Sequence, residues 1–320
     1  CREPGSGPLT LAVKSVDEAL DYVPKIPRVG MRLARRCWPG PVTLQFNDAQ
    51  SDSLIQRLPP RVQEAVAPQG VIRLRVPAHD LISSALRLLA GPLVVAGAHC
   101  PGEQDSVTGQ EVLQRIGKEV DVVIDAGRCK LSQPSTIVFV DGQKIEIPRI
   151  GAVSETNLKR LASWIAVVVC TGNTCRSPMA EVLLRKRIAE KLGCTPEELE
   201  ERGIMVMSAG VAASPGVRAA TEAVMAMKQR GIDLSMHESQ PLTDRLVRFA
   251  DVILTMTRSH RDAIVSNFPD AAARTHIISK NRGDVSDPIG GPAELYNRCA
   301  DQIDGYLASW MDELDFESDG

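Results

Sequence analysis

Nine residues, 170–178, with the sequence Cys-Thr-Gly-Asn-Thr-Cys-Arg-Ser-Pro, hold the side chains of this chain that are best suited to chemistry. Cys170 supplies a thiol, and Arg176 supplies a guanidinium whose fork can grip two phosphate oxygens. The residues between them can turn a ring of backbone N–H groups toward a tetrahedral oxyanion. Gly172 and Asn173 tolerate the positive φ angles that such a ring requires. The sequence therefore predicts an anion-binding loop that contains a nucleophile.

The flanking residues predict a strand before this loop and a helix after it. Residues 165–169, Ile-Ala-Val-Val-Val, form a continuous apolar run typical of a buried strand. Ser177 is a good N-cap and Pro178 a good first helical residue, so we expect a helix over residues 179–192. The positive end of its dipole would point at the loop and, with the nearby guanidinium, favour the thiolate of Cys170.

Two other interpretations of these cysteines are possible. An isolated cysteine at the end of an apolar strand is usually a buried core residue. The coincidence of strand, glycine turn, arginine and Ser-Pro helix start favours a functional role here. A zinc site at Cys170 and Cys175 would need a second pair of ligands nearby, and the sequence offers none.

Residues 165–320 resemble the low-molecular-weight protein tyrosine phosphatase family, whose signature is a cysteine, five residues, an arginine and a serine. The resemblance extends to residues 208–210 (Ser-Ala-Gly), 250–256 (Ala-Asp-Val-Ile-Leu-Thr-Met) and 284–290 (Asp-Val-Ser-Asp-Pro-Ile-Gly). In this family the aspartate of the late Asp-Pro motif is the general acid. The resemblance therefore implies that Asp287 has this role.

The implied reaction needs no metal and no cofactor. Cys170 would attack phosphorus to form a cysteinyl-phosphate, while Asp287 protonates the departing group and later accepts a proton from the attacking water. Arg176 and the loop would stabilise the charge on the phosphoryl oxygens. The phosphate-binding loop comprises Thr171, Gly172, Asn173, Thr174, Cys175 and Ser177.

Thr174 bears on the substrate. Tyrosine phosphatases of the family usually carry Ile at this position, whereas the protein-arginine phosphatases carry Thr in the same Thr-Gly-Asn-Thr-Cys-Arg loop. The resemblance implies that the hydroxyl favours a guanidinium-phosphate and helps to place the hydrolytic water. Residues 255–257 and His260 also resemble the arginine-phosphatase branch, and no aromatic residue follows Asp287-Pro288. We expect a phosphorylated protein substrate that carries phosphoarginine or phosphotyrosine.

Three other residues of this half have weaker assignments. Family members often have a second cysteine that forms a protective disulfide with the nucleophile, and Cys175 occupies that position, although a small loop-packing residue is an equal alternative. His237 and His260 are interpreted as ordinary surface or partly buried histidines.

The first half carries a second set of motifs, at residues 38–44 (Trp-Pro-Gly-Pro-Val-Thr-Leu), 72–79 (Ile-Arg-Leu-Arg-Val-Pro-Ala-His), 134–138 (Pro-Ser-Thr-Ile-Val) and 149–153 (Arg-Ile-Gly-Ala-Val). With them, residues 1–158 resemble the YrdC-like threonylcarbamoyl-AMP synthase family, which makes an activated intermediate for tRNA modification. The resemblance implies ATP with Mg²⁺ if this half is active, and nucleotide or double-stranded RNA binding. The residues concerned are Arg2, Arg73, Arg75, Ser135 and Arg149.

Two departures from the family pattern predict an impaired synthase. The Ser-Ala-Asn motif of the family is replaced by Gly97-Ala98-His99 here. The N-terminal portion of the family is also missing, so we expect a truncated domain. We therefore interpret Cys1 as a fragment boundary. Loss of part of a pocket for three reactants would slow synthesis by orders of magnitude. The arginines could equally be solvated charges on strand faces.

Three functions therefore compete: a cysteine-dependent phosphatase, a thiol arsenate reductase, and a nucleotide- or RNA-binding protein whose first half still makes threonylcarbamoyl-AMP. A reductase of the related kind would need a resolving cysteine pair, but residues 231–266 contain no cysteine, and Cys194 and Cys299 are isolated. The phosphatase is the favoured function.

Composition agrees with this interpretation. A chain of 320 residues suggests two domains, and 37 Lys plus Arg against 40 Asp plus Glu gives no global basic field for nucleic acid. No apolar run approaches transmembrane length, so no membrane partner is expected. The eight cysteines have no disulfide-framework spacing, and one must remain a thiolate, which favours the reducing cytoplasm.

The alternation of apolar segments predicts two α/β domains, at residues 1–158 and 165–320, joined by a linker at 159–164. The first should have a mixed, incomplete sheet, and the second a doubly wound parallel sheet with Cys170 at the carboxyl end of its first strand. Strands in the first half are expected at 42–46, 70–76, 93–96, 120–125, 136–140 and 144–147, with helices near 16–22, 81–90, 110–116 and 154–161.

Overall fold

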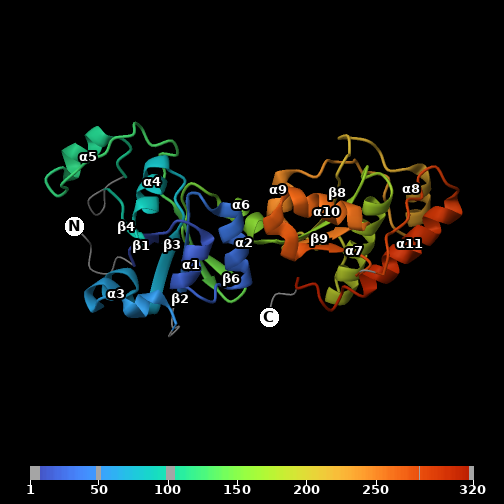
Figure 1. Ribbon diagram of the computed structural model, residues 1–320, viewed down its shortest axis with the longest axis horizontal. Helices are drawn as coiled ribbons and strands as arrows, with labels where there is room; N and C mark the ends of the chain where they lie inside the picture. Colours follow the sequence, from blue (N-terminus) through green and yellow to red (C-terminus); the bar gives the residue numbers. More distant parts are fainter. Residues whose placement is uncertain (1–7, 48–51, 99–104, 281, 317–320) are drawn as a thin grey trace. The chain divides into compact units, whose positions relative to one another are not determined.

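The computed structural model describes residues 8–47, 52–98, 105–280 and 282–316 (Figure 1). Its contacts divide the chain into an N-terminal unit within Cys1–Ala162 and a C-terminal unit within Ser163–Ser318. Helix α6 (Glu155–Ala162) ends the first unit, and strand β7 (Trp164–Cys170) begins the second one. No helix in the described parts of the chain is both long enough and apolar enough to cross a membrane.

The N-terminal unit is built on a mixed sheet with the strand order β4-β1-β3-β2-β5-β6. The central strands β1 and β3 run parallel, as do β2 and β5, while the other neighbours are antiparallel. The strands are β1 (Thr10–Ala12), β2 (Val42–Asn47), β3 (Val71–Arg75), β4 (Leu93–Val95), β5 (Thr136–Asp141) and β6 (Lys144–Arg149). The expected mixed α/β architecture is confirmed.

The helices of this unit supply the apolar residues that complete its core. Leu33 of one helix is fully buried in the same cluster as Leu44 and Leu74 of the sheet. Burial of such side chains contributes about 1.5–3 kcal/mol each. The helices are α1 (Val16–Tyr22), α2 (Arg28–Cys37), α3 (Pro60–Val66), α4 (Asp80–Leu88), α5 (Gly109–Ile116) and α6, with 3₁₀ turns at Leu54–Arg57 and Pro68–Gly70.

The strand predicted at residues 120–125 is absent, which corrects the sequence prediction. These residues have no regular secondary structure, and the side chains of Val122 and Ile124 are 74% and 76% exposed. A strand needs a neighbour to receive its backbone hydrogen bonds. No strand among the described residues pairs with this segment, so its alternating pattern has no sheet to join.

The C-terminal unit contains a parallel sheet with the strand order β10-β9-β7-β8. The chain passes from β7 to β8 (Ile204–Gly210) on one side, and later to β9 (Val252–Thr255) and β10 (Thr275–Ile277) on the other. In open α/β sheets, ligands bind where the winding reverses, outside the carboxyl ends of the strands. Here that point is the carboxyl end of β7, which carries Cys170.

Helices cover both faces of this sheet, which confirms the expected doubly wound fold (Figure 1). Alternate residues of β7 enter two separate cores: Ala166 and Val168 pack in the larger cluster with α7 and α11, and Ile165 and Val167 in the smaller one with α9 and α10. The helices are α7 (Arg176–Leu192), α8 (Thr221–Lys228), α9 (Asp244–Phe249), α10 (Arg258–Asn267) and α11 (Ala293–Ala308), with a 3₁₀ turn at Pro269–Arg274.

Candidate active site

Cys170 ends strand β7, opposite Gly210 at the end of β8. Its side chain is 3% exposed and lies inside the turn that leads to α7. The Sγ atom is 2.9 Å from the Ser177 hydroxyl oxygen, and the backbone N–H of Asn173 donates to Sγ over 3.3 Å. The loop therefore curls around the sulfur and directs hydrogen-bonding groups toward it.

Helix α7 begins at Arg176, three residues before the predicted start. Cys175 is at the N-cap position, where its side chain makes no capping hydrogen bond. The prediction that Ser177 caps this helix is wrong, because Ser177 lies inside the first turn, and its buried hydroxyl contacts Cys170 and Asn173. A helix start without a side-chain cap suits a bound anion, which can satisfy the first N–H groups instead.

Asn173 gives the loop its shape. Its φ of 55° lies in the left-handed region, which Asn tolerates better than most residues. Its side-chain amide donates to Ser177 Oγ (2.9 Å) and Ser208 Oγ (2.8 Å), and its Oδ1 accepts from the backbone of Gln240 (2.8 Å). Gly172, for which a positive φ was also expected, does not adopt one. A single buried side chain thus ties the loop to β8 and to the segment before α9.

The long connection between β8 and α9 supports the other side of the loop. His237 Nε2 is 2.8 Å from the carbonyl oxygen of Asn173, and the N–H of Ala220 donates to the carbonyl of Thr174 (2.9 Å). With these two carbonyls engaged outside, the N–H groups of the loop are free to turn inward. The interpretation of His237 as an ordinary histidine missed this contact, which no spacing along the sequence reveals.

The structure brings Arg176 together with Asp287, which lies 111 residues later in the chain. Arg176 is only 5% exposed, and its Nη2 forms an ion pair with Asp287 Oδ2. Its Nη1 donates to the carbonyl of Val285 (3.1 Å), and Nη2 also donates to Thr171 Oγ1 (3.4 Å). Asp287 is 39% exposed, and its second oxygen accepts from the N–H of Ile289 (3.2 Å). The carboxylate is therefore held at the mouth of the loop.

His260 connects this arginine to helix α10. Its Nε2 is 2.9 Å from Thr171 Oγ1, and its Nδ1 is 2.9 Å from the hydroxyl of Thr257, the N-cap residue of α10. Burial, and then the positive charge of Arg176, lower the pKa of His260. The imidazole is therefore neutral at neutral pH and acts as a hydrogen-bonding group, contrary to its interpretation as an ordinary histidine.

Two other cysteines occur in this region: Cys175 in the loop itself and Cys299 on helix α11. Cys175 Sγ is 3.7 Å from the hydroxyl of Tyr296, and Cys299 Sγ is 3.8 Å from the carbonyl oxygen of Ser286. Burial raises the pKa of Cys175 and raises that of Cys299 to about 12. Both groups therefore remain thiols near neutral pH.

Glu181 of α7 extends the network beneath the loop. The Ser208 hydroxyl donates to Glu181 Oε2 over 2.6 Å and also accepts from Asn173. Burial is the main cause that raises the pKa of this carboxyl, although its hydrogen bond to Ser208 and the nearby His237 act in the opposite direction. A largely buried carboxyl group is thus linked to Cys170 through the side chains of Ser208, Asn173 and Ser177.

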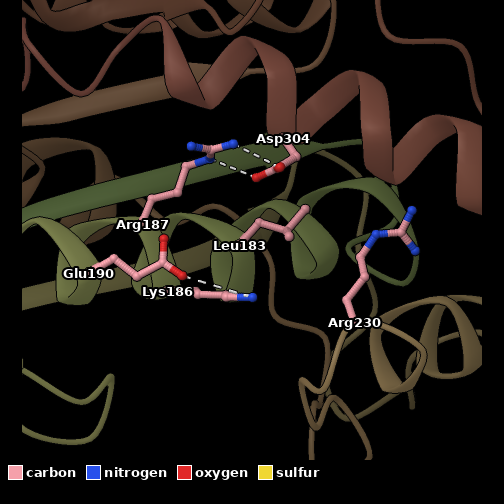
Figure 2. A pocket seen from close by; sticks show the side chains of 6 residues that line it. All are labelled: Leu183, Lys186, Arg187, Glu190, Arg230 and Asp304. Atoms are coloured by element: carbon pink, nitrogen blue, oxygen red, sulfur yellow. Dashed lines mark hydrogen bonds and ion pairs between the residues drawn. The ribbon is translucent and has the colours of Figure 1, made fainter.

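A separate pocket lies between α7, α11 and the end of α8 (Figure 2). Arg187 donates two hydrogen bonds to Asp304 (2.7 and 2.8 Å), and Lys186 lies 3.9 Å from Glu190. Arg230 pairs with Asp301. Each cation that lines this pocket lies within ion-pair distance of a carboxylate, and none of the predicted site residues belongs to it.

The N-terminal unit brings three of its predicted residues together. Arg149 donates to the carbonyl (3.1 Å) and the hydroxyl (3.1 Å) of Ser135, and Arg75 donates to the carbonyl of Gly40 (2.9 Å). Burial, followed by the charge of Arg149, lowers the pKa of Arg75. Two guanidinium groups that repel each other in this way are suited to bind an anion.

The remaining predicted residues of this unit are less informative. Arg73 Nε donates to Gln45 Oε1 (2.9 Å), and its Nη1 donates to the carbonyl of Pro8 (3.2 Å). Arg2 and His99 lie outside the described residues.

Comparison with known proteins identifies both halves. Residues 165–319 match the family described as low molecular weight phosphotyrosine protein phosphatase. The second half of the chain belongs to this family of cysteine-dependent phosphatases. Residues 2–151 match the Sua5/YrdC family, described as telomere recombination. Both resemblances inferred from the sequence motifs are thereby confirmed.

Several relatives of this phosphatase have names that specify a substrate. Protein-arginine-phosphatases of Geobacillus stearothermophilus and Bacillus subtilis are 37% and 39% identical to this chain over 153 and 152 residues. These matches cover 47% and 46% of this chain and 95% of each relative. A probable low molecular weight protein-tyrosine-phosphatase EpsP of Ralstonia nicotianae is 32% identical over 149 residues, which cover 46% of this chain and 94% of the relative.

Glu181 provides a test of the network beneath the loop. Because its pKa is raised in the folded protein, its contribution to stability is complete at low pH and is lost as the pH rises from the unfolded pKa, about 4.3, to the folded pKa. The Glu181→Gln variant cannot ionise. The difference in the free energy of unfolding between this variant and wild type, measured in urea, should therefore increase in favour of the variant by about 1.4 kcal/mol per pH unit across this window.

The matched control for this experiment is Glu190→Gln, which removes an exposed carboxyl from the same helix. Its unfolding free energy should follow the wild-type pH dependence. Parallel pH profiles for wild type and Glu181→Gln would contradict the inferred burial of this charge.

Proposed function

We propose that the C-terminal unit hydrolyses protein phosphoarginine, in preference to phosphotyrosine, through a cysteinyl-phosphate intermediate. The observation that carries this proposal is the ion pair between Arg176 and Asp287 at the mouth of the loop that surrounds Cys170. This geometry brings a thiol, a guanidinium and a carboxyl group into one small site, which supports their proposed roles as nucleophile, phosphate-binding cation and acid. The names of the two arginine-phosphatase relatives support the choice of substrate.

The first step transfers the phosphoryl group to sulfur. The thiolate of Cys170 attacks phosphorus, and the S–P bond forms as the P–N bond of phosphoarginine breaks. Asp287 gives its proton to the leaving guanidine nitrogen. Arg176 and the loop N–H groups bind the three equatorial oxygens, on which charge is spread in the transition state.

The second step restores the thiolate. Water attacks the phosphorus of the cysteinyl-phosphate, and Asp287 accepts the proton of that water as the S–P bond breaks. The Ser177 hydroxyl, 2.9 Å from Sγ, is placed to stabilise the departing thiolate. Inorganic phosphate leaves, and no cofactor takes part in either step. Because the thiolate must stay reduced, a reducing compartment such as the cytoplasm suits this chemistry.

The ion pair of the free protein must open when substrate binds. In the absence of substrate, Arg176 pairs with Asp287. A bound phosphoryl group would form hydrogen bonds with the guanidinium in place of this carboxyl. The Asp287 side chain would then be released to face the leaving group, as the first step requires.

The rim of the site favours a polar leaving group over a phenol. Thr174 is half-buried in the loop, with its hydroxyl 3.6 Å from Cys175 Sγ. The exposed apolar residues that neighbour the catalytic groups in sequence or by hydrogen bond are aliphatic: the N–H of Val211 donates to the carbonyl of Cys170, and Ile289 follows the Asp-Pro motif. Neither supplies the aromatic face on which a phosphotyrosine ring would stack.

Substitution of the nucleophile tests the reaction itself. Cys170→Ser should lower kcat for a phosphoarginine peptide by about four orders of magnitude, because a serine hydroxyl lacks the reactivity of a thiolate. Asp287→Asn should lower kcat by about 10²–10³-fold, because the leaving group then departs without a proton. The half-buried Cys194→Ser provides a matched control and should retain full activity. Undiminished turnover by Cys170→Ser would refute the mechanism.

A second experiment tests the substrate. Thr174→Ile removes the loop hydroxyl while it retains the branched shape, so the ratio of kcat/KM for phosphoarginine to that for phosphotyrosine peptides should fall at least about tenfold. Thr174→Ser, which keeps the hydroxyl, is the matched control and should preserve the ratio. An unchanged ratio in Thr174→Ile would show that this hydroxyl does not select the substrate.

A second candidate function, for the N-terminal unit, is the binding of ATP or RNA and the synthesis of threonylcarbamoyl-AMP for tRNA modification. The mutual proximity of Arg75 and Arg149, next to the Ser135 hydroxyl, favours a phosphate ligand here. Arg2 and Arg73 are proposed to contribute to the same function. Synthesis would also require Mg²⁺, which ATP-dependent enzymes usually bind through one or two carboxylates together with the phosphates of the nucleotide.

Nucleotide binding can be measured directly by calorimetry. Arg75→Ala should weaken ATP binding about tenfold or more, because a partly desolvated cation at a phosphate is difficult to replace. The exposed Arg57→Ala variant is the control and should bind as wild type does. Loss of affinity in both variants alike, or no ATP and no double-stranded RNA binding by the wild type, would remove this candidate. Formation of threonylcarbamoyl-AMP from ATP, threonine and bicarbonate would extend it to synthesis.

A further inference from the structure

We propose that His260 is a positioning residue, which holds the guanidinium of Arg176 in place through the hydroxyl of Thr171. The inference rests on the proposed phosphatase function. His260 Nε2 and Arg176 Nη2 both contact Thr171 Oγ1, so the hydroxyl of Thr171 joins the two side chains. The contact between His260 and Thr171 therefore adds a support for the orientation of Arg176 that the loop alone does not provide.

The geometry forms a continuous chain of contacts. The Thr257 hydroxyl is 2.9 Å from His260 Nδ1, His260 Nε2 is 2.9 Å from Thr171 Oγ1, and Arg176 Nη2 donates to the same oxygen over 3.4 Å. Both ring nitrogens are thus engaged, and the ring is only 7% exposed. The imidazole has no freedom to rotate without the loss of both contacts.

The Thr171 side chain needs such a partner because Thr171 is exposed to solvent. An exposed threonine side chain on a loop can change rotamer at little cost. His260 removes this freedom in either neutral tautomer: as a donor from Nε2 it fixes one lone pair of Thr171 Oγ1, and as an acceptor it fixes the hydroxyl proton. In both cases a lone pair of this oxygen remains directed at Arg176.

The contact matters most after substrate enters. In the free protein, Arg176 has three acceptors: the carbonyl of Val285, the hydroxyl of Thr171 and the carboxylate of Asp287. The proposed mechanism takes Asp287 away, because it must protonate the leaving group. The two remaining acceptors then orient the guanidinium against the phosphoryl oxygens. Catalytic groups misplaced by a fraction of an ångström lose much of their effect.

The charges around His260 are consistent with a neutral imidazole in this role. Arg176 faces it with a positive charge, and Asp284 and Asp287 face it with negative charges that oppose the effect of burial. The N–H of Arg258, at the start of the same helix, donates to Asp284 Oδ1 (2.8 Å). The Asp284 carboxylate is therefore partly stabilised by a backbone hydrogen bond. A neutral ring adds orientation without a further positive charge beside Arg176.

Two substitutions of His260 separate positioning from simple packing. In His260→Gln, the amide can reach the position of Nε2 and bond Thr171, whereas in His260→Asn it reaches only the position of Nδ1 and bonds Thr257. Thr171→Val removes the hydroxyl without a change of shape, and Thr171→Ser keeps it. The control for loss of a partly buried imidazole is His276→Gln on β10, where the ring packs against Trp310.

We expect kcat for a phosphoarginine peptide to fall about tenfold in Thr171→Val and in His260→Asn, with KM changed less than threefold, because the guanidinium acts chiefly on the transition state. His260→Gln and Thr171→Ser should restore kcat to within about threefold of wild type. The double variant Thr171→Val/His260→Asn should be no slower than either single variant, because the two residues act through one contact.

A binding measurement separates this inference from the proposed function. In a Cys170→Ser background, affinity for inorganic phosphate should fall about threefold to tenfold with Thr171→Val and should recover with Thr171→Ser. If wild type has no turnover that depends on Cys170, the proposed function fails. If turnover is intact but Thr171→Val leaves kcat and phosphate affinity unchanged, or if the two substitutions are additive, the role of His260 is refuted. Thr171 is exposed, so this result does not depend on whether the His260 variants fold.

Discussion

The buried side chain of Asn173 is the constraint on which the rest of the site depends. An anion-binding loop must turn its N–H groups inward, and this leaves its carbonyls and its backbone strain to be accommodated elsewhere. Asn173 adopts the left-handed conformation. Its side-chain amide forms hydrogen bonds with Ser177, Ser208 and the backbone of Gln240. Through these contacts one residue couples the loop to α7, to β8 and to the segment before α9.

Arg176 is the second centre of the site, because its buried guanidinium contacts Thr171 of the loop and the segment that carries Val285 and Asp287. It begins α7, so the helix fixes its backbone, and its side chain reaches across the loop to Val285 and Thr171. Asp287 is attached to the site chiefly by its charge. The free protein therefore holds the Asp287 carboxyl and the Arg176 guanidinium together at the loop.

Much of the C-terminal unit could be predicted from local sequence. The apolar run before Cys170 predicted the strand, and the small residues after it predicted the loop. Together they predicted the position of the thiol at the switch point of the sheet. The start of α7 could not be predicted in this way, because Ser177 followed by Pro178 is a standard helix beginning and only the geometry of the loop overrides it. In the N-terminal unit, residues 120–125 alternate as a strand should, yet they have no strand to pair with.

By itself, the sequence determined the chemical groups and, through the resemblance of its motifs, the two families, because motifs consist of residue types at short spacings. Only the tertiary structure decided which distant side chains meet. His237, His260 and Tyr296 touch the loop from three different segments, and nothing in their spacing indicates it. Side-chain contacts of this kind arise from the packing of whole helices and strands, so they appear only when the sheet and its two helical layers are assembled.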